Sequence, residues 1–175
     1  GRTGSLSMIL AVSPPGGDFT EPVTQCCLRV SGTFYMLDSS LAHSRHFPAV
    51  NWTQSYTLYD RITGPVFDRT VDPEWSPLRD RCRSILQQEG GLREIAEIVG
   101  REGMQDADRL VMASAEQLRT RFLAQNAYSD DAFSPPDKTL QLCRDIIAEH
   151  DRLKEKLDAG EALDDLLKEK KDAPV

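Results

Sequence analysis

One aromatic residue in this sequence stands where a ring could be held still for binding. Phe47 comes directly before Pro48, which restricts the backbone of the residue that precedes it. A flat, weakly hydrated ring such as a nucleotide base is best held by an aromatic face and a few polar edges. The alternative is that Phe47 and the distant Tyr128 are ordinary core aromatic residues, which composition alone favours. The residue types therefore allow a ring-binding site without establishing one.

Carboxylates are plentiful, but no pair of them can be assigned a catalytic role. The adjacent pairs Asp130-Asp131 and Asp164-Asp165 are typical of solvated helix ends and loops. His43 and His46 are three positions apart, on one face of a helix, yet two histidines alone make neither a catalytic nor a metal site. The pattern G-x-x-x-x-G-K-[ST], whose loop and lysine cradle phosphates, does not occur in the sequence. We expect no catalytic residue and no metal site in this chain.

Charge and cysteine usage exclude several function classes. The net charge is −7, and lysine and arginine are scattered among acids, so no basic stripe offers a nucleic-acid surface. No apolar run approaches membrane-spanning length and no signal peptide opens the sequence, so we expect a protein that is soluble by itself. The four cysteines contain no C-x-x-C pair, and we expect them to be reduced and mostly buried. They are Cys26, Cys27, Cys82 and Cys143.

The first third of the sequence predicts strands and loops. Residues 5–12 form a short apolar run, which predicts a fully buried strand, and the Pro/Gly-rich residues 13–18 predict a loop. Residues 28–37 regain strand character through Val, Thr, Phe and Tyr. Asp38 is expected to cap a short helix that runs to about His46. Residues 52–72 lack sustained periodicity, and we place the domain boundary there.

From Pro73 onward the period changes to that of helices. Asp72 is expected as the N-cap of a first helix, with Pro73 at its first position and Gly90-Gly91 as its end. Residues 92–99 predict a second helix that Gly100 stops, and residues 106–125 predict a third. A fourth begins with Asp137 as its cap and ends at Gly160, before a short amphipathic piece at residues 161–170. The expected apolar faces are Leu78, Cys82, Ile85 and Leu86; Leu92, Ile95, Ala96, Ile98 and Val99; Leu110, Val111, Ala115, Leu118 and Phe122; and Leu140, Cys143, Ile147 and Leu153.

Three separated motifs give these elements a family context. The SPPGGDF loop with EP and VTQ, the run LDSSLA–RHFPA–NW, and the later RFLAQNAY occur in this order. In order and spacing they resemble the catalytic A subunit of vacuolar/archaeal-type rotary ATPases over most of the chain. The resemblance implies an α+β fold: residues 1–71 as the short, β-containing C-terminal end of a nucleotide-binding domain, and residues 72–175 as a C-terminal α-helical bundle.

The resemblance also implies what these residues do. In that family the aromatic residue of HFPA, here Phe47, packs on adenine, and FLxQNA plus an aromatic residue supplies the opposite wall. The wall corresponds here to Gln125, Asn126, Ala127 and Tyr128, with Ala124 standing where Gln is common. The family's catalytic Glu and phosphate-binding Lys would lie before Gly1. This chain alone is therefore expected to be inactive and to hold no cofactor, whereas the full-length subunit would bind ATP or ADP with Mg²⁺.

Partners follow from the same resemblance. The hexamer of this family contains A and B subunits in alternation, and the turn at residues 100–108 would face the central rotating shaft. The complex would couple ATP hydrolysis or synthesis to ion transport, leaving this chain cytoplasmic and peripheral to the membrane. From the residues alone, the turn is an ordinary helix–helix connection with Asp106 as an N-cap. A rival interpretation of the whole chain is a helical protein-interaction domain without a nucleotide role.

Overall fold

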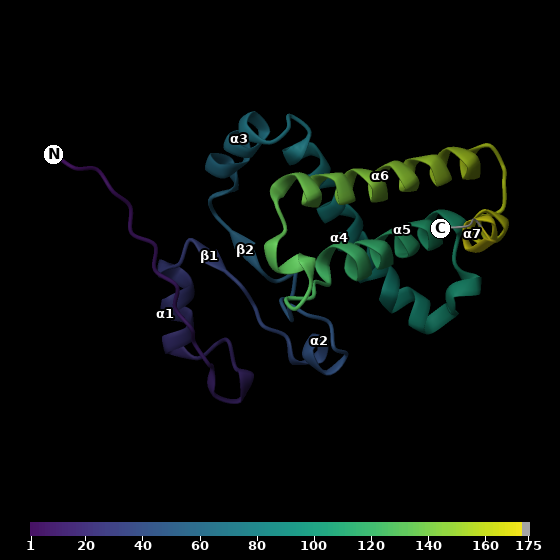
Figure 1. Ribbon diagram of the computed structural model, residues 1–175. Helices are drawn as coiled ribbons and strands as arrows, with labels where there is room; N and C mark the ends of the chain where they lie inside the picture. The colour runs from purple at the N-terminus through teal and green to yellow at the C-terminus, as the bar shows by residue number, and fades with distance from the viewer. Residues whose placement is uncertain (173–175) are drawn as a thin grey trace.

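Helices dominate the structure, a computed structural model that describes the backbone of residues 1–172 and the side chains of residues 1–167 (Figure 1). The α-helices are α1 (Pro22–Val30), α2 (Ser39–His43), α3 (Asp60–Thr70), α4 (Trp75–Val99), α5 (Asp106–Gln117), α6 (Pro136–Asp158) and α7 (Leu163–Asp172). Shorter helical turns are η1 (Pro15–Gly17), η2 (Arg101–Gly103), the π-helix η3 (Leu118–Leu123) and η4 (Asp130–Phe133). The strands are β1 (Thr33–Phe34) and β2 (Tyr56–Thr57).

Helices α4, α5 and α6 lie side by side and enclose the main core (Figure 1). On each helix apolar residues recur every three or four positions, which places them on one face. The faces expected for the first, third and fourth helices contain most of this core, so the C-terminal helical bundle is confirmed. The buried core residues are Leu78, Cys82, Ile85, Leu86, Ala115, Leu118, Leu140, Cys143, Ile146 and Ile147.

Helix α7 closes one end of the bundle. Gly160, with φ of 96°, allows the sharp turn after α6, because a left-handed backbone costs glycine nothing. Leu163 and Leu166 are then buried against Leu110 and Leu153 in a second apolar cluster. The amphipathic piece expected near residues 161–170 is therefore confirmed as a packed helix. None of the helices described here is long and apolar enough to cross a membrane.

The β-structure is smaller than expected. Strands β1 and β2 are antiparallel, with Thr33 opposite Thr57 and Phe34 opposite Tyr56. In the segment at residues 28–37, for which we predicted a strand, the last turn of α1 covers residues 28–30 and β1 covers only residues 33–34. Glu21 explains this helix, because its carboxylate accepts hydrogen bonds from the N–H groups of Val23 and Thr24 at 3.0 and 2.8 Å. Cys26 and Cys27 thus lie on a helix, Cys26 exposed and Cys27 half-buried.

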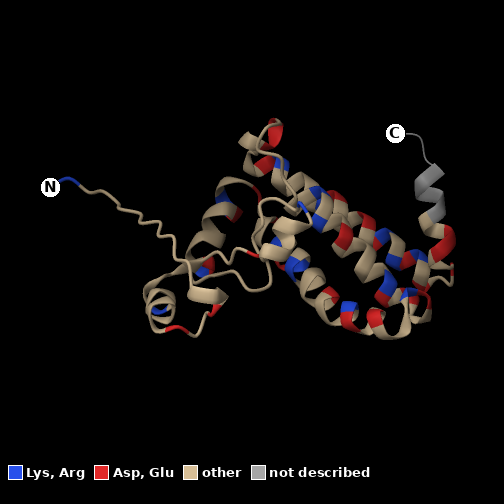
Figure 2. Cartoon of the chain, turned by 90° about the horizontal axis from the view of Figure 1, so that it is seen from below, with Lys and Arg blue, Asp and Glu red and all other residues tan. Residues whose placement is uncertain are grey.

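The predicted buried strand at residues 5–12 is wrong in this structure. The segment has no regular secondary structure and extends away from the bundle in Figures 1 and 2. Leu6 is 85% exposed and Ile9 is 98% exposed. A strand needs neighbouring backbone to bond and a surface to cover its side chains, and the described residues supply neither to this segment. The segment has the apolar pattern of a buried strand, but no described strand pairs with it.

The predicted helix break at Gly90-Gly91 is also wrong. Gly90 and Gly91 lie inside α4, which continues unbroken to Val99, since glycine lowers helix stability by only about 1 kcal/mol relative to alanine. The residues expected to form a second buried face are largely exposed, as at Ile98, which is 85% exposed. The segment at residues 52–72, where we predicted no sustained periodicity, contains α3, and Gly64-Pro65 lies inside this helix. A Cβ on Gly64 would stand 3.1 Å from Ser76 Oγ of α4. The glycine thus permits the close approach of α3 to α4.

The predicted helix caps differ in detail. Asp38 is the N-cap of α2, as expected. Helix α4 begins two residues later than predicted, with Glu74 at the N-cap, while Asp72 Oδ1 accepts the N–H of Glu74 at 2.8 Å. Asp106 is the first residue of α5 and not its cap, which is Gln105. Asp137 likewise lies inside the first turn of α6, after the cap position at Pro135.

Candidate functional site

Phe47 is carried by a loop that is closed by hydrogen bonds on both sides. The N–H of Asp38 donates to the carbonyl oxygen of Ala49 at 2.9 Å, and Leu37 pairs with Val50 in an isolated β-bridge. Asn51 Nδ2 donates to Asp38 Oδ2 at 2.9 Å. The chain between these contacts is therefore a closed loop with Phe47-Pro48 near its end.

The Asp38 carboxylate holds the start of this loop. It accepts hydrogen bonds from the hydroxyl and the N–H of Ser40, at 2.6 and 2.8 Å, in addition to the Asn51 amide. These bonds to its charged form, the Ser40 hydroxyl first, lower the pKa of Asp38 to about 2. The loop is therefore fixed by an ionised carboxylate throughout the neutral pH range.

The second predicted wall follows the π-helix. The N–H of Ala124 donates to the carbonyl oxygen of Arg119 at 2.9 Å, which ends η3. The N–H of Gln125 then donates to the carbonyl oxygen of Phe47 at 2.7 Å. Two segments that the sequence separates widely are thus joined directly through their backbones.

The side chains of the predicted wall differ in their contacts and exposure. Asn126 Oδ1 accepts the N–H of Tyr128 at 3.0 Å, which shapes a local turn. The ring of Tyr128 is fully exposed, and Phe47 is 53% exposed. Neither aromatic residue is therefore an ordinary core side chain. The structure joins the backbones at Phe47 and Gln125; that the Phe47 and Tyr128 rings form two walls of one slot stays a prediction.

A buried ion cluster lies next to this site, and the sequence reasoning missed it. The Glu89 carboxylate on α4 is 3% exposed. Its Oε1 accepts hydrogen bonds from Arg93 Nη2 at 2.7 Å and from Arg119 Nη1 of η3. Burial alone would raise the pKa of Glu89, but the bonds from the two guanidinium groups hold it below its usual value. One signal was available: Glu89 continues the apolar stripe of Cys82 and Leu86, where a carboxylate must be paired.

The cluster borders a polar cavity of about 520 Å³. Arg93, Arg101 and Arg119 face it together with Glu89 and Glu97. His46, beside Phe47, also lines it and packs on Trp52, with ring centroids 5.4 Å apart. Burial and then the nearby charge of Arg119 lower the pKa of His46, which favours its neutral form. No group of three or more potential metal ligands gathers within the residues that the structure describes.

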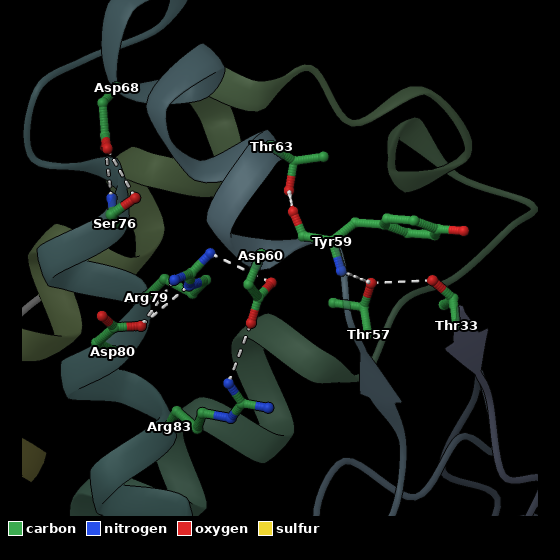
Figure 3. A network of polar contacts seen from close by, with 10 residues as sticks. All are labelled: Thr33, Thr57, Tyr59, Asp60, Thr63, Asp68, Ser76, Arg79, Asp80 and Arg83. Atoms are coloured by element: carbon green, nitrogen blue, oxygen red, sulfur yellow. Dashed lines mark hydrogen bonds and ion pairs between the residues drawn. The ribbon is translucent and has the colours of Figure 1, made fainter. Parts of the chain in front are cut away.

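A polar network connects the small sheet and α3 to the bundle (Figure 3). Thr33 and Thr57 share a hydroxyl hydrogen bond of 2.9 Å across the sheet, and the N–H of Tyr59 donates to Thr57 Oγ1 at 3.2 Å. Asp60 at the start of α3 contacts Arg79 at 3.5 Å and Arg83 at 3.4 Å, both on α4. The network therefore ties the β-containing part to the same helix that carries Glu89.

A mostly apolar cavity of about 350 Å³ lies between the sheet and the bundle. Trp52 and Trp75 line it, and so do the buried thiols of Cys82 and Cys143. The hydrogen bond between these thiols lowers the pKa of Cys82 and raises that of Cys143. This cavity lies among core residues and does not include Phe47 or residues 125–128.

The turn at residues 100–108 is partly as expected. Gly100, with φ of 75°, ends α4, and η2 follows with exposed residues at Arg101 and Glu102. Met104 is buried, however, so the turn is anchored by one side chain and is not polar throughout. Asp106 binds Arg109 at 3.0 Å and accepts the N–H of Leu163 at 3.3 Å. Its role is thus to join α5 to α7.

Comparisons with known proteins agree with this architecture. The family model for the C-terminal domain of V and A type ATP synthase matches residues 65–165. The model for the nucleotide-binding domain of the ATP synthase alpha/beta family matches residues 1–57. Among solved structures, NeqB from Nanoarcheaum equitans, which belongs to an ATP synthase, has a TM-score of 0.66 at 18% identity. That likeness covers 78% of this chain and 34% of the other, and concerns the fold alone.

Several curated relatives are more similar in sequence. The A subunit of the A-type ATP synthase of Thermococcus onnurineus is 44% identical over 95% of this chain and 29% of the relative. The V-type ATP synthase alpha chain of Anaeromyxobacter dehalogenans is 46% identical over the same shares. The V-type ATP synthase alpha chain 1 of Clostridium tetani is 43% identical over 95% of this chain and 28% of the relative. The chain thus spans less than a third of the length of these relatives.

Proposed function

Because the chain belongs to the V and A type ATP synthase family, whose catalytic A subunit it matches in the C-terminal region, we propose that it supplies part of an adenine-binding site in a rotary ATPase. In the full-length subunit, ATP or ADP with Mg²⁺ would bind, and hydrolysis or synthesis of ATP would be coupled to ion transport. Phosphoryl transfer depends mainly on positioning and charge stabilisation. The share of this chain is to hold the base.

One observation carries this proposal: the 2.7 Å hydrogen bond from the N–H of Gln125 to the carbonyl oxygen of Phe47. It brings together the two motifs that the family resemblance assigns to the adenine site. Phe47 and Tyr128 keep exposed ring surface beside this bond, 53% and 100% of each residue, respectively. Exposed aromatic faces held by a fixed backbone are suited to stacking on a base.

The test is Phe47→Ala in the full-length subunit within its assembled complex. Loss of a base–aromatic stack should weaken ATP binding by about 1–3 kcal/mol. The matched control is Tyr35→Ala, which removes another exposed aromatic residue, 71% exposed, directly after β1. Equal nucleotide dissociation constants for the Phe47 variant and the unaltered protein would refute the base-holding role.

The chain alone should bind nucleotide weakly and should not hydrolyse it. Much of the affinity for a nucleotide comes from phosphate contacts, and the sequence contains no phosphate-binding loop. Calorimetry on residues 1–175 should therefore detect no tight, Mg²⁺-dependent ATP binding. Tight binding would contradict the assignment of this chain to the base-holding part only.

We also propose the partners that this role requires. B subunits would alternate with catalytic A subunits around a hexamer, and residues 100–108 would contact the central shaft. The complex would place this chain at the cytoplasmic side of a membrane without contact to the lipid. Figure 2 shows positively and negatively charged residues interspersed along the helices, which fits protein contacts better than a nucleic-acid surface.

A further inference from the structure

Glu89 is the one charged side chain that is buried among the residues whose side chains the structure describes. A carboxylate removed from water is costly unless it is paired and hydrogen-bonded. Both conditions are met, since Oε1 of Glu89 accepts hydrogen bonds from Arg93 and Arg119. These two contacts hold different parts of the chain in place.

The two arginines differ in what they connect. Arg93 lies one turn further along α4, so its contact with Glu89 fixes nothing outside that helix; its side chain is 52% exposed. Arg119 belongs to η3, and its side chain is only 19% exposed. The contact between Glu89 and Arg119 therefore joins the middle of α4 to the π-helix.

Arg119 is also tied to the candidate base site through its backbone. Its carbonyl oxygen accepts the N–H of Ala124 at 2.9 Å, which closes η3. The following residue, Gln125, makes the bond to Phe47. The same arginine lines the polar cavity with His46, the neighbour of Phe47. A displacement of Arg119 would thus reach both segments of the site.

We propose that Glu89 is a positioning residue for the base site, which it holds through Arg119, η3 and the Phe47–Gln125 bond. Glu89 does not itself touch the nucleotide. The inference rests on the proposed function, since it assigns Glu89 to that same site. A purely structural ion pair would stabilise the fold equally well but would leave nucleotide affinity unchanged once the protein is folded.

The experiment uses the full-length subunit in its assembled complex and compares KM with kcat for ATP. Glu89→Gln keeps the shape of the side chain but removes its charge. It should raise KM about 5- to 10-fold, the lower end of the range for a lost base stack, with kcat little changed. Arg119→Gln should do the same. The double variant should lose no more than either single variant, because both act through one contact.

Two further variants keep the test decisive. Glu97→Gln is the matched control, because it removes an exposed carboxylate from the same helix and the same cavity, and its KM should stay unchanged. If Glu89→Gln does not fold, Glu89→Asp keeps the charge and shortens the reach by one methylene. It too should raise KM. A folded Glu89 variant with unaltered KM would overturn the inference.

The proposed function can fail separately. If Phe47→Ala raises KM while folded Glu89 variants do not, the base site stands and the positioning role is wrong. If Phe47→Ala leaves KM unchanged, the base site itself is wrong and the positioning role falls with it. Melting temperatures measured on every variant separate loss of fold from loss of nucleotide affinity.

Discussion

The N–H of Gln125 donates a 2.7 Å hydrogen bond to the carbonyl oxygen of Phe47, and this contact joins the small N-terminal elements to the end of η3. It is a backbone contact, so substitutions of most kinds at residue 125 preserve it. Proline alone removes the donor. This difference allows the bond to be tested without changing the aromatic side chains.

We predict that Gln125→Pro destabilises the protein and weakens ATP binding in the full-length protein. Loss of one hydrogen bond should cost about 1 kcal/mol of unfolding free energy. Ala124 already has the extended backbone that a residue before proline prefers, with φ of −77° and ψ of 120°. Gln125→Ala is the control, because it removes the side chain but keeps the N–H. Urea unfolding and nucleotide titration of both variants measure the effect; equal results for the two would show that the bond contributes nothing.

A second prediction concerns the glycines inside α4. Gly90 and Gly91 are exposed, and a Cβ on either would meet nothing within 4 Å. Each change to alanine should therefore raise the unfolding free energy by about 0.5–1 kcal/mol through helix propensity. Gly100→Ala is the contrasting control, since its φ of 75° strains any residue with a Cβ. It should lower stability, and thermal unfolding that gave all three variants the same sign would contradict this account.

Local patterns predicted the bundle well because each helix carries its own apolar stripe. Leu78, Cys82 and Ile85 are buried at the helical spacing that the sequence shows. Asp38 caps α2 by accepting the N–H of Ser40, two residues away. Helix breaks were harder. Gly90-Gly91 is a weak local signal, because two glycines lower helix stability by only about 1 kcal/mol each, which does not end a long helix whose earlier turns are buried.

Contacts between distant residues were beyond local patterns. No local pattern around Glu89 predicts its contact with Arg119, and none around Phe47 predicts its contact with Gln125. The family resemblance linked the last two to one site, but did not supply the ion pair behind it. The strand prediction for residues 5–12 failed for a related reason. An apolar run is a local pattern, whereas a strand needs a neighbouring strand, and none lies beside this segment among the residues that the structure describes.

A third prediction follows from His150, which is half-buried on α6. Ser114 Oγ of α5 and His150 Nδ1 lie 2.8 Å apart, and the charged groups around the ring are Asp151, Arg81 and Lys154. Burial lowers the pKa of His150 in the folded state; Asp151 opposes this shift and the two cations add to it. The unfolded chain then binds the proton more readily. The contribution of His150 to stability is full above about pH 6.5 and is lost as pH falls through its folded pKa.

Unfolding free energies measured from about pH 7.5 to about pH 5.5 should therefore decrease towards acid. His150→Gln cannot titrate but can still bond to Ser114, so its decrease should be smaller. Some decrease should remain, because burial lowers the pKa of His46 as well. Parallel curves for the two proteins would mean that His150 titrates alike in the folded and unfolded states.

The last prediction concerns the turn proposed to meet the shaft. Glu102 and Gln105 are exposed there, whereas Met104 is buried and Asp106 joins α5 to α7. Changing only Glu102 and Gln105 to alanine should alter stability by less than about 0.5 kcal/mol, as expected for exposed sites. ATP hydrolysis by the isolated hexamer should change little, while ion pumping per ATP by the complete complex should fall. Replacing the exposed Gln88 and Glu94 of α4 with alanine is the matched control. If both double variants pump as many ions per ATP as the unaltered complex, the turn is only a connection between helices.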